Sequence, residues 1–242
     1  MAHLLSARNL TKTFGGLVAI NDVSFDLPAG QTLGIIGPNG AGKSTLFSLL
    51  TGFLAPNTGE VIYDGRSVVG FKPAHICKLG LTRTFQIMQN FPTLSTLENV
   101  MVGAFLHNGS ASRAREEAAR VLERVGLAVK AHVAAKDLTM LDQKRLEIAK
   151  ALATKPKIIL ADETMAGLTP VEIQDAVGLI RSLRGDGITF ILIEHVMEVI
   201  MSLSDRVLVL HHGNKISEGT PVEVANDKQV IDAYLGEEDS LV

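Results

Sequence analysis

The chain has 242 residues, enough for one large domain, or for a domain with an inserted subdomain, to bury a sizeable core. Its net charge of −3 lacks the strongly basic signature of nucleic-acid-binding proteins, and its single cysteine, Cys77, cannot form an internal disulfide, which fits a reducing cytosolic setting. Mean hydropathy is high at +0.24, yet the longest apolar stretch, residues 189–203, is interrupted by charged residues and is too short to span a membrane.

The N-terminal part of the chain contains several strand-like segments. Residues 4–10 and 19–27 are rich in β-forming residues, and apolar and polar residues alternate in the second segment. The short apolar run at 31–36 is typical of a buried strand, and residues 60–65 resemble a strand that ends in a turn. We therefore expect a β-rich start that leads into a buried strand.

A glycine-rich motif follows that strand. Residues 37–45 read Gly-Pro-Asn-Gly-Ala-Gly-Lys-Ser-Thr, the spacing of a phosphate-binding P-loop, and a helix-like segment follows at 46–50. The glycines let backbone N–H groups reach phosphate oxygens, while Lys43 supplies a positive charge and Ser44 a hydroxyl for Mg²⁺. The motif predicts a site for a nucleoside triphosphate. The alternative is a glycine-rich turn before an ordinary helix.

Helical periodicity begins at about residue 112. Glu116 stands four residues before Arg120, the spacing of an ion pair on a helix surface. A second helix is expected over residues 144–154, just before a proline. The residues expected on the buried face of the first helix are Ala114, Ala118, Val121, Leu122 and Val125.

The C-terminal half alternates apolar runs with helix-like sequence. Runs at residues 158–161, 188–193 and 207–210 have the length of buried strands. Alternation of this kind is typical of β and α units that build a parallel sheet. The sequence therefore predicts an α/β fold.

One helix in this half has a well-marked start. Thr169 offers an N-cap hydroxyl, Pro170 suits the first helical position, and Glu172 stands three residues after the cap. We expect this helix to run over residues 170–184.

Three residues after buried strands could carry chemistry. Asp162 is placed to coordinate Mg²⁺ directly or through water, and Glu163 to act as a general base or to position the attacking water. His195 follows the run at 188–193, at the sheet edge where ligands collect, and can donate a hydrogen bond to a phosphate oxygen. The alternatives are a strand that ends in two solvated acids and a histidine with a structural or surface role.

The order of these pieces resembles that of the ATP-binding subunits of ABC transporters over nearly the whole chain. The resemblance implies an α/β P-loop NTPase fold with a RecA-like core and a mainly parallel sheet, an N-terminal antiparallel β subdomain and an inserted α-helical subdomain. It implies one ABC-type ATPase domain over residues 1–242, with the helical insertion at about 87–150 carrying a signature-like segment. The pieces that carry the resemblance are residues 37–45, Gln86 within Thr84-Phe85-Gln86, residues 138–152, Asp162, Glu163 and His195.

The same resemblance implies roles for single residues. Phe14 would be the aromatic platform for adenine, Gln86 the residue that senses Mg²⁺ and the γ-phosphate, and His195 the switch histidine. For Phe14 the alternative is a plain core aromatic. The expected sets are Lys43, Glu163 and His195 for catalysis; Ser44, Gln86 and Asp162 for Mg²⁺; and Phe14, Gly37, Pro38, Asn39, Gly40, Ala41, Gly42, Lys43, Ser44, Thr45 and Gln86 for ATP.

Within this family, residues 80–86, 96–103 and 163–168 look most like those of branched-chain amino-acid importers and of the similar urea or short-amide importers. The resemblance implies an ATPase at the cytoplasmic face of the cell membrane, bound peripherally to transmembrane permease subunits. It also implies a second ATP-binding subunit, in a homodimer or a heterodimer, and an extracytoplasmic solute-binding protein in the full complex. No nucleic-acid partner is expected.

The chain departs from the family pattern at two places. The family signature is usually Leu-Ser-Gly-Gly-Gln, whereas residues 138–142 read Leu-Thr-Met-Leu-Asp, so that Thr139 keeps a hydroxyl but both glycines are replaced. In the family this segment caps the γ-phosphate of the ATP held by the opposite subunit. Thr169 also replaces the usual aspartate of the D-loop. The departures predict an intact nucleotide site on this chain and a degraded surface for the partner's nucleotide.

Two other functions remain open from the sequence. A soluble ABC-type ATPase acting on the ribosome or DNA usually carries two linked nucleotide-binding units or long coiled-coil insertions, and neither fits in 242 residues. In a P-loop kinase of small metabolites, Asp162 and Glu163 would serve an acceptor hydroxyl, but residues 138–152 would have no evident role.

Overall fold

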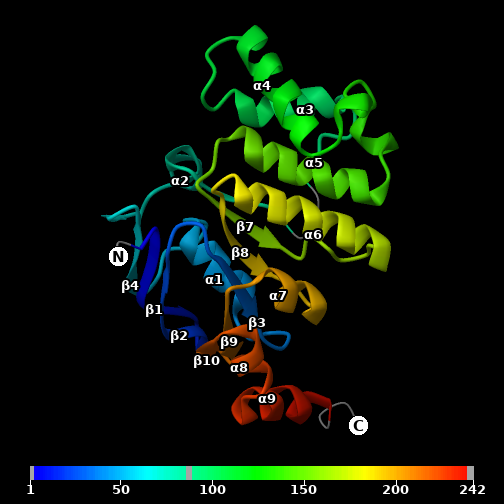
Figure 1. Cartoon of the computed structure of the whole chain (residues 1–242). Helices are drawn as coiled ribbons and strands as arrows, with labels where there is room; N and C mark the ends of the chain where they lie inside the picture. The colour runs from blue at the N-terminus through cyan, green and yellow to red at the C-terminus, as the bar shows by residue number, and fades with distance from the viewer. Residues whose placement is uncertain (1–2, 86–88, 239–242) are drawn as a thin grey trace. The chain divides into compact units, whose positions relative to one another are not determined.

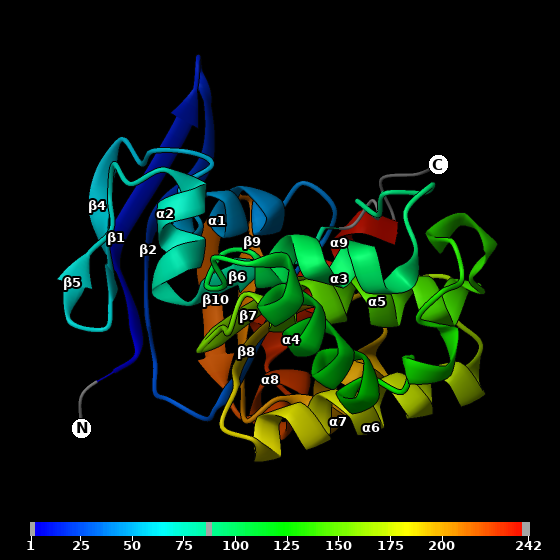
Figure 2. The ribbon, with the colours of Figure 1, turned by 90° about the horizontal axis from the view of Figure 1, so that it is seen from above.

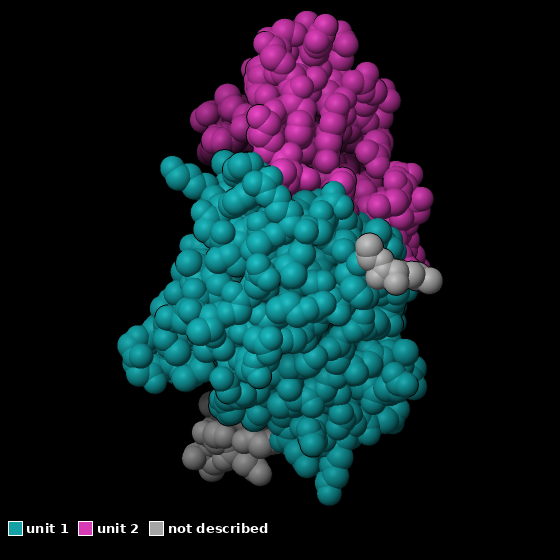
Figure 3. Space-filling model, turned by 90° about the vertical axis from the view of Figure 1, so that its left-hand side faces the viewer, with its two compact units in different colours: residues 1–76, 189–242 teal, residues 77–188 magenta. Residues whose placement is uncertain are grey.

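The computed structural model describes residues 3–85 and 89–238 of the chain. The chain divides into two compact units, coloured separately in Figure 3: unit 1 comprises residues 1–76 and 189–242, and unit 2 comprises residues 77–188. Within the described ranges, no helix is both long enough and apolar enough to cross a membrane. The P-loop belongs to unit 1, and the acidic pair Asp162 and Glu163 belongs to unit 2.

Unit 1 contains an antiparallel sheet built from the start of the chain (Figure 2). Its strands, in spatial order, are β2 (Leu17–Leu27), β1 (Leu5–Phe14), β4 (Thr58–Tyr63) and β5 (Arg66–Ser67). The antiparallel β subdomain expected from the sequence is therefore confirmed.

The first two strands are longer than their apolar pattern predicts. Phe14 pairs with Leu17, and the two glycines between them form a tight hairpin turn in which Gly15 has a φ of 56°. The polar residues 11–13 continue β1 even though they do not show the alternation used to predict strands. Phe14 is therefore the last residue of β1 and lies directly before the hairpin turn.

The remaining strands of unit 1 are mainly parallel. β3 (Thr32–Ile36) pairs in parallel with both β8 (Thr189–Ile193) and β9 (Arg206–His211), and β10 (Asn214–Gly219) pairs with β9 in the antiparallel direction. All residues of β3 and β8 are buried, as their continuous apolar runs predict. Because the three parallel strands point the same way, the segments that follow them emerge at one edge of the sheet.

Four helices of the described chain belong wholly to unit 1. α1 directly follows the P-loop, whereas α7, α8 and α9 belong to the C-terminal part of the chain (Figure 1). The sequence gives α8 the same start signal as residues 169–172, Thr-Pro-Val-Glu, here at 220–223. The bounds are α1 (Lys43–Leu50), α7 (Met197–Leu203), α8 (Pro221–Ala225) and α9 (Lys228–Glu238).

Unit 2 pairs two parallel strands and contains four of the described helices in full. β6 (Leu81–Arg83) pairs with β7 (Ile158–Asp162), and α3 packs against both α4 and α5 (Figures 1 and 2). The boundary with unit 1 falls inside α2 (Pro73–Leu79). The other helices are α3 (Thr96–Ala104), α4 (Ala111–Arg124), α5 (Met140–Ala153) and α6 (Pro170–Gly185), with 3₁₀ turns at Ala128–Lys130 and Ala135–Asp137.

The predicted helices of unit 2 form, with two differences in detail. All five residues expected on the inner face of α4 are buried. Arg120 hydrogen-bonds to Glu117, three residues before it and at 2.6 Å, and not to Glu116 as predicted from the four-residue spacing. α5 begins at Met140, four residues earlier than expected, because Thr139 provides an N-cap.

α6 starts as its sequence predicts. The Thr169 hydroxyl accepts a hydrogen bond from the Glu172 N–H at 3.4 Å, and the Glu172 carboxylate accepts one from the Thr169 N–H at 2.8 Å. The backbone hydrogen bond from Thr169 also lowers the pKa of Glu172. Thr169, which occupies the usual D-loop aspartate position, therefore serves as a helix cap.

Replacement of Thr169 by alanine removes the cap hydroxyl and is expected to lower the free energy of unfolding by about 1 kcal/mol. For a chain of this size the melting temperature should fall by about 2–4 °C, which thermal denaturation followed by circular dichroism can detect. Thr169→Ser keeps the hydroxyl and serves as the matched control. Equal melting temperatures for the alanine variant and the wild type would contradict the capping role.

Candidate functional site

The P-loop lies between β3 and α1, and two of its glycines have no room for a side chain. A Cβ placed on Gly37, whose φ is 149°, would lie 2.1 Å from the carbonyl oxygen of Leu210 on β9. A Cβ on Gly42, whose φ is 105°, would lie 2.4 Å from the carbonyl oxygen of Ala19 on β2. The loop is therefore fixed by close backbone contacts on two sides, which only glycine permits.

Lys43, the first residue of α1, is only 8% exposed. Its Nζ donates hydrogen bonds to the carbonyl oxygens of Gly37 at 2.6 Å and Pro38 at 2.9 Å. The ammonium group is thus held against the loop, and the N-terminus of α1 adds the positive end of the helix dipole. A helix N-terminus with a lysine at its first position is suited to bind a phosphate group.

A pocket of about 360 Å³ opens between the P-loop and the tip of the β1–β2 hairpin, all within unit 1. Phe14 is 45% exposed at this pocket, and Lys12 Nζ lies 5.3 Å from the centre of its ring. One end of the pocket is apolar and the other carries Lys43 and Ser44, which suits a ligand with a flat ring and an anionic tail. The pocket is lined by Phe14, Leu17, Val18, Ala19, Gly40, Ala41, Gly42, Lys43, Ser44, Thr45 and His212.

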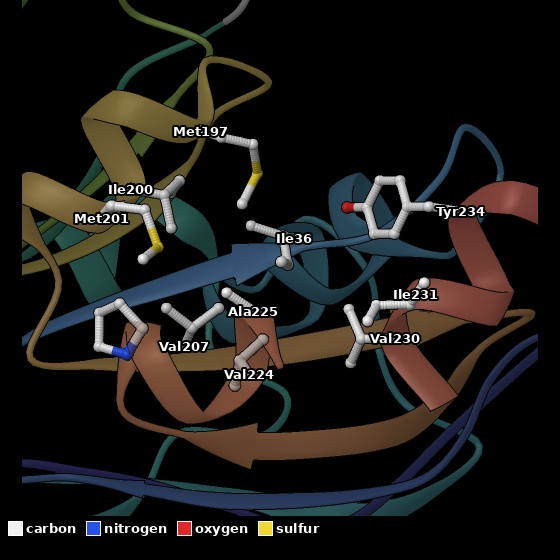
Figure 4. Close-up of a pocket in the computed structure, with 11 residues that line it drawn as sticks. Ile36, Met197, Ile200, Met201, Val207, Val224, Ala225, Val230, Ile231 and Tyr234 are labelled. Carbon is white, nitrogen blue, oxygen red and sulfur yellow. The ribbon is translucent and has the colours of Figure 1, made fainter. Parts of the chain in front are cut away.

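A second cavity in unit 1, of about 320 Å³, lies among the C-terminal helices (Figure 4). Side chains of α7, α8 and α9 converge there with Ile36 and Val207, and the Tyr234 hydroxyl points toward Ile36. Among the described residues that line this cavity, none is charged. It is therefore unsuited to a triphosphate, and the P-loop pocket is the candidate nucleotide site.

In unit 2, Asp162 ends β7 and is 3% exposed. Its Oδ2 accepts a hydrogen bond from the Arg83 guanidinium at 2.6 Å, and its N–H donates to the Thr84 hydroxyl at 3.3 Å. Arg83 belongs to β6, the strand next to β7 in this unit, so strand pairing brings the two charges together. The buried carboxylate is thereby compensated by a largely buried guanidinium.

Glu163, the next residue, has a left-handed backbone with a φ of 50°. Such a conformation costs an unbranched residue about 1–3 kcal/mol and persists where the surroundings hold it in place. Here Lys144 Nζ, from α5, donates to the carbonyl oxygen of Glu163 at 3.3 Å. The half-buried Glu163 side chain is therefore set by a strained turn, as is frequent at functional sites.

Two of the other predicted site residues, His195 and Ser44, are exposed to solvent. His195 is exposed, two residues after the end of β8 in unit 1. Gln86 lies outside the described residues. Ser44 is exposed on the first turn of α1. The Ser44 hydroxyl of unit 1 and the Asp162 carboxylate of unit 2 are each an oxygen donor of the type that Mg²⁺ prefers.

The signature-like segment forms the N-terminus of α5 and is tied together by hydrogen bonds. The Thr139 hydroxyl donates to Asp142 Oδ2 at 2.6 Å and accepts from the Asp142 N–H at 3.3 Å. Lys130 forms an ion pair with the same carboxylate. Burial alone would raise the pKa of Asp142, but the hydrogen bonds from Lys130 and Thr139 outweigh it and hold the pKa below its ordinary value.

Sequence reasoning missed two contributors to these sites. Arg83 carried no motif that would pair it with Asp162, and only the register of β6 with β7 reveals the contact. His212 carried no motif either, and it reaches the P-loop pocket from the turn between β9 and β10. Both depend on pairing between segments far apart in the chain.

Comparison with known protein families matches residues 20–166 to a family described as ABC transporter and residues 214–240 to one described as branched-chain amino acid ATP-binding cassette transporter. The chain is 40% identical to the high-affinity branched-chain amino acid transport ATP-binding protein LivG of Salmonella typhimurium and to that of Escherichia coli strain K12. It is 38% identical to the corresponding protein BraF of Pseudomonas aeruginosa. Each match covers 97% of this chain and 98% of the relative.

Solved structures of ATP-binding cassettes are also similar. A nucleotide-free cassette from an ABC transporter has a TM-score of 0.88 and 31% identity, and covers 96% of this chain and 99% of its own. A cassette in its ADP conformation has a TM-score of 0.89 and 32% identity, and covers 98% and 100%. A dimeric bacterial ABC transporter cassette has a TM-score of 0.80 and 28% identity, and covers 90% and 98%. These similarities confirm the predicted P-loop NTPase fold.

The interactions of Asp142 predict a pH-dependent contribution to stability. Because its pKa is lower in the folded chain than the ordinary 3.8, the pairing stabilises the fold above that pH and is lost as the pH falls through the folded-state pKa. Asp142→Asn should therefore be less stable than the wild type at pH 6, and the difference should shrink below about pH 4.

Urea unfolding of both proteins between pH 6 and pH 3 gives the free energy of unfolding of each. The difference between the two values at each pH no longer contains the titration of the groups that both proteins share. A difference that stays constant across the whole range would contradict the role given to the Asp142 carboxylate.

Proposed function

This chain belongs to the ABC transporter family of ATP-binding proteins, and from that premise we propose that it is the ATP-hydrolysing subunit of an importer for branched-chain amino acids or a related small solute. The observation that carries the proposal is the P-loop pocket of unit 1, with a glycine-fixed phosphate cradle at one end and the exposed ring of Phe14 at the other. Relatives that cover 97% of the chain are named as ATP-binding proteins of branched-chain amino acid transport, which supports the solute class.

In this proposal ATP lies along the P-loop pocket. Its adenine packs on Phe14, and its phosphates accept hydrogen bonds from the backbone of residues 37–45 and from Lys43, which then gives up its contacts with the carbonyl oxygens of Gly37 and Pro38. The loop residues Asn39, Gly40, Ala41 and Thr45 contribute to the same cradle. The neutralisation of the negative charge of the triphosphate makes its terminal phosphorus accessible to water.

The acids of unit 2 supply the hydrolytic chemistry. Asp162 and Ser44 would each offer an oxygen ligand to Mg²⁺, which would neutralise charge on the phosphates. We assign Glu163 to orient and deprotonate the attacking water, a role that its constrained backbone suits. His195, which follows β8 at the sheet edge, is assigned to the γ-phosphate. Gln86 is assigned to sensing Mg²⁺ and the γ-phosphate from the family resemblance.

The proposed partners follow from the family. Two ATP-binding subunits close around ATP, and the segment from Gln86 to about Lys136 contacts the permease. We place the protein at the cytoplasmic face of the membrane, with an extracytoplasmic solute-binding protein in the complete complex. The soluble ATPase of the ribosome or DNA is not favoured, because the relatives named above are transport proteins over almost the full chain.

The structure adds an argument for unequal nucleotide sites. The Thr139 hydroxyl, the one side-chain donor kept from the usual signature, already donates to the Asp142 carboxylate. To reach a partner's ATP it must break that hydrogen bond, and it would bring a carboxylate close to the phosphates. The P-loop cradle of this chain carries no such competing acid among its described lining residues. We therefore propose a heterodimer in which the site on this chain is the efficient one.

Glu163→Gln and Lys43→Ala should separate hydrolysis from binding. Loss of the glutamate is expected to lower ATP turnover by about a hundredfold or more while leaving ATP affinity nearly unchanged. Loss of the lysine is expected to weaken ATP affinity itself, because it removes the ammonium group at the phosphates. Equilibrium nucleotide binding and steady-state turnover measure the two effects, and wild-type turnover in Glu163→Gln would overturn the assigned role.

The unequal sites can be tested in assembled transporters. Glu163→Gln in this chain should remove most of the ATPase activity, whereas the corresponding change in the partner ATP-binding subunit should remove little. Phosphate release by the purified, reconstituted complex gives both rates. Equal losses of ATPase activity from the two changes would contradict the proposed difference between the two nucleotide sites.

A further inference from the structure

The turn between β9 and β10 brings a histidine into the P-loop pocket. His212 lines this pocket together with Phe14, Val18 and the loop residues 40–45, although it lies almost 170 positions further along the chain than the loop. None of the roles derived above uses it. From its position we propose that His212 contacts the nucleoside part of the bound nucleotide and so increases affinity for ATP; this deepens, and rests on, the proposed ATPase function.

The backbone of the turn is fixed to the P-loop and to β2. The Gly213 N–H donates to the Ala41 carbonyl oxygen at 3.0 Å, and the Asn21 N–H donates to the Gly213 carbonyl oxygen at 2.8 Å. A Cβ on Gly213, whose φ is 79°, would lie 2.9 Å from the carbonyl oxygen of Ala19. Gly213 is thus hydrogen-bonded to the P-loop residue Ala41, which fixes the backbone of the neighbouring His212 beside the P-loop.

The conformation of His212 supports an ordered ring. Its φ of 45° is left-handed, a conformation that histidine, asparagine and aspartate adopt more often than other residues with a side chain. Its ring lies 4.1 Å from the ring of His211, with an angle of 48° between the two planes. Asn214 Nδ2 also donates to the His212 carbonyl oxygen at 3.0 Å. The imidazole therefore stands at the pocket on a constrained turn and beside a second ring.

The composition of the pocket indicates which part of a nucleotide His212 meets. The P-loop amides and Lys43 already supply the donors for the phosphates, whereas Phe14, Leu17 and Val18 form an apolar surface for a base. An imidazole offers a flat face for packing and a nitrogen for a hydrogen bond, which match the purine and ribose of a nucleoside. We assign His212 to binding of the ground state, with no part in hydrolysis.

The test is a comparison of His212→Asn with the wild-type full chain. Asparagine tolerates the left-handed backbone, so the turn keeps its shape while the ring is lost. The dissociation constant for ATP is expected to rise about fivefold or more. That for inorganic triphosphate, which has no nucleoside, should stay unchanged, and in steady-state kinetics KM for ATP should rise while kcat is retained.

His211→Asn is the matched control, because it removes the neighbouring ring, which packs beside His212 but does not line the pocket, and it should weaken ATP binding less than His212→Asn does. His212→Gly, which also permits the left-handed backbone, should repeat the effect of His212→Asn. Equal ATP affinity for His212→Asn and wild type, or an equal loss for ATP and inorganic triphosphate, would overturn the inference. Absence of saturable ATP binding by the wild type would instead refute the proposed function itself.

Discussion

The nucleotide site depends on one steric constraint: at Gly37 and Gly42 there is no space for a Cβ. Carbonyl oxygens of β9 and β2 lie 2.1 and 2.4 Å from the positions such atoms would take. The loop is therefore held between the parallel strands and the antiparallel sheet of unit 1, and its amides keep a fixed arrangement before any ligand arrives. Preorganised donors of this kind lose little freedom when an anion binds. The same β9 strand leads into the turn that brings His212 to the pocket.

Charge in the described sites is compensated locally. Lys43 is bound to loop carbonyl oxygens, Asp162 to Arg83, and Asp142 to Lys130 and Thr139. Each charged side chain can change partners at a modest net free energy, whereas leaving it buried and unpaired would be costly. Such exchange suits an ATPase, because phosphates and Mg²⁺ can replace the protein partners during binding. The Asp142 carboxylate at the start of α5 acts against nucleotide binding. It accepts a hydrogen bond from the Thr139 hydroxyl, which the nucleotide on a partner subunit would need.

The sequence predicted local features well and distant contacts poorly. The P-loop, the strands of 158–162 and 189–193, and the cap of α6 follow from composition, periodicity and capping chemistry over a few residues. α3 was missed although Ser95 and Glu98 form a capping box, a signal that residues 95–98 do contain. The Arg83–Asp162 ion pair and the place of His212 could not be predicted, because they depend on which strands become neighbours. The roles of Glu163 and His195 were inferred from their positions after buried strands, the family resemblance adds to them, and both remain predictions.

The most direct measurement is a structure of the full chain with a non-hydrolysable ATP analogue and Mg²⁺. In that structure the triphosphate should lie on the amides of residues 40–45, Lys43 Nζ should have moved from the Gly37 and Pro38 carbonyl oxygens to phosphate oxygens, and the base should pack on Phe14. A nucleotide bound elsewhere, or one in this pocket with Lys43 still hydrogen-bonded to the loop, would show that the P-loop pocket is not the nucleotide site proposed here.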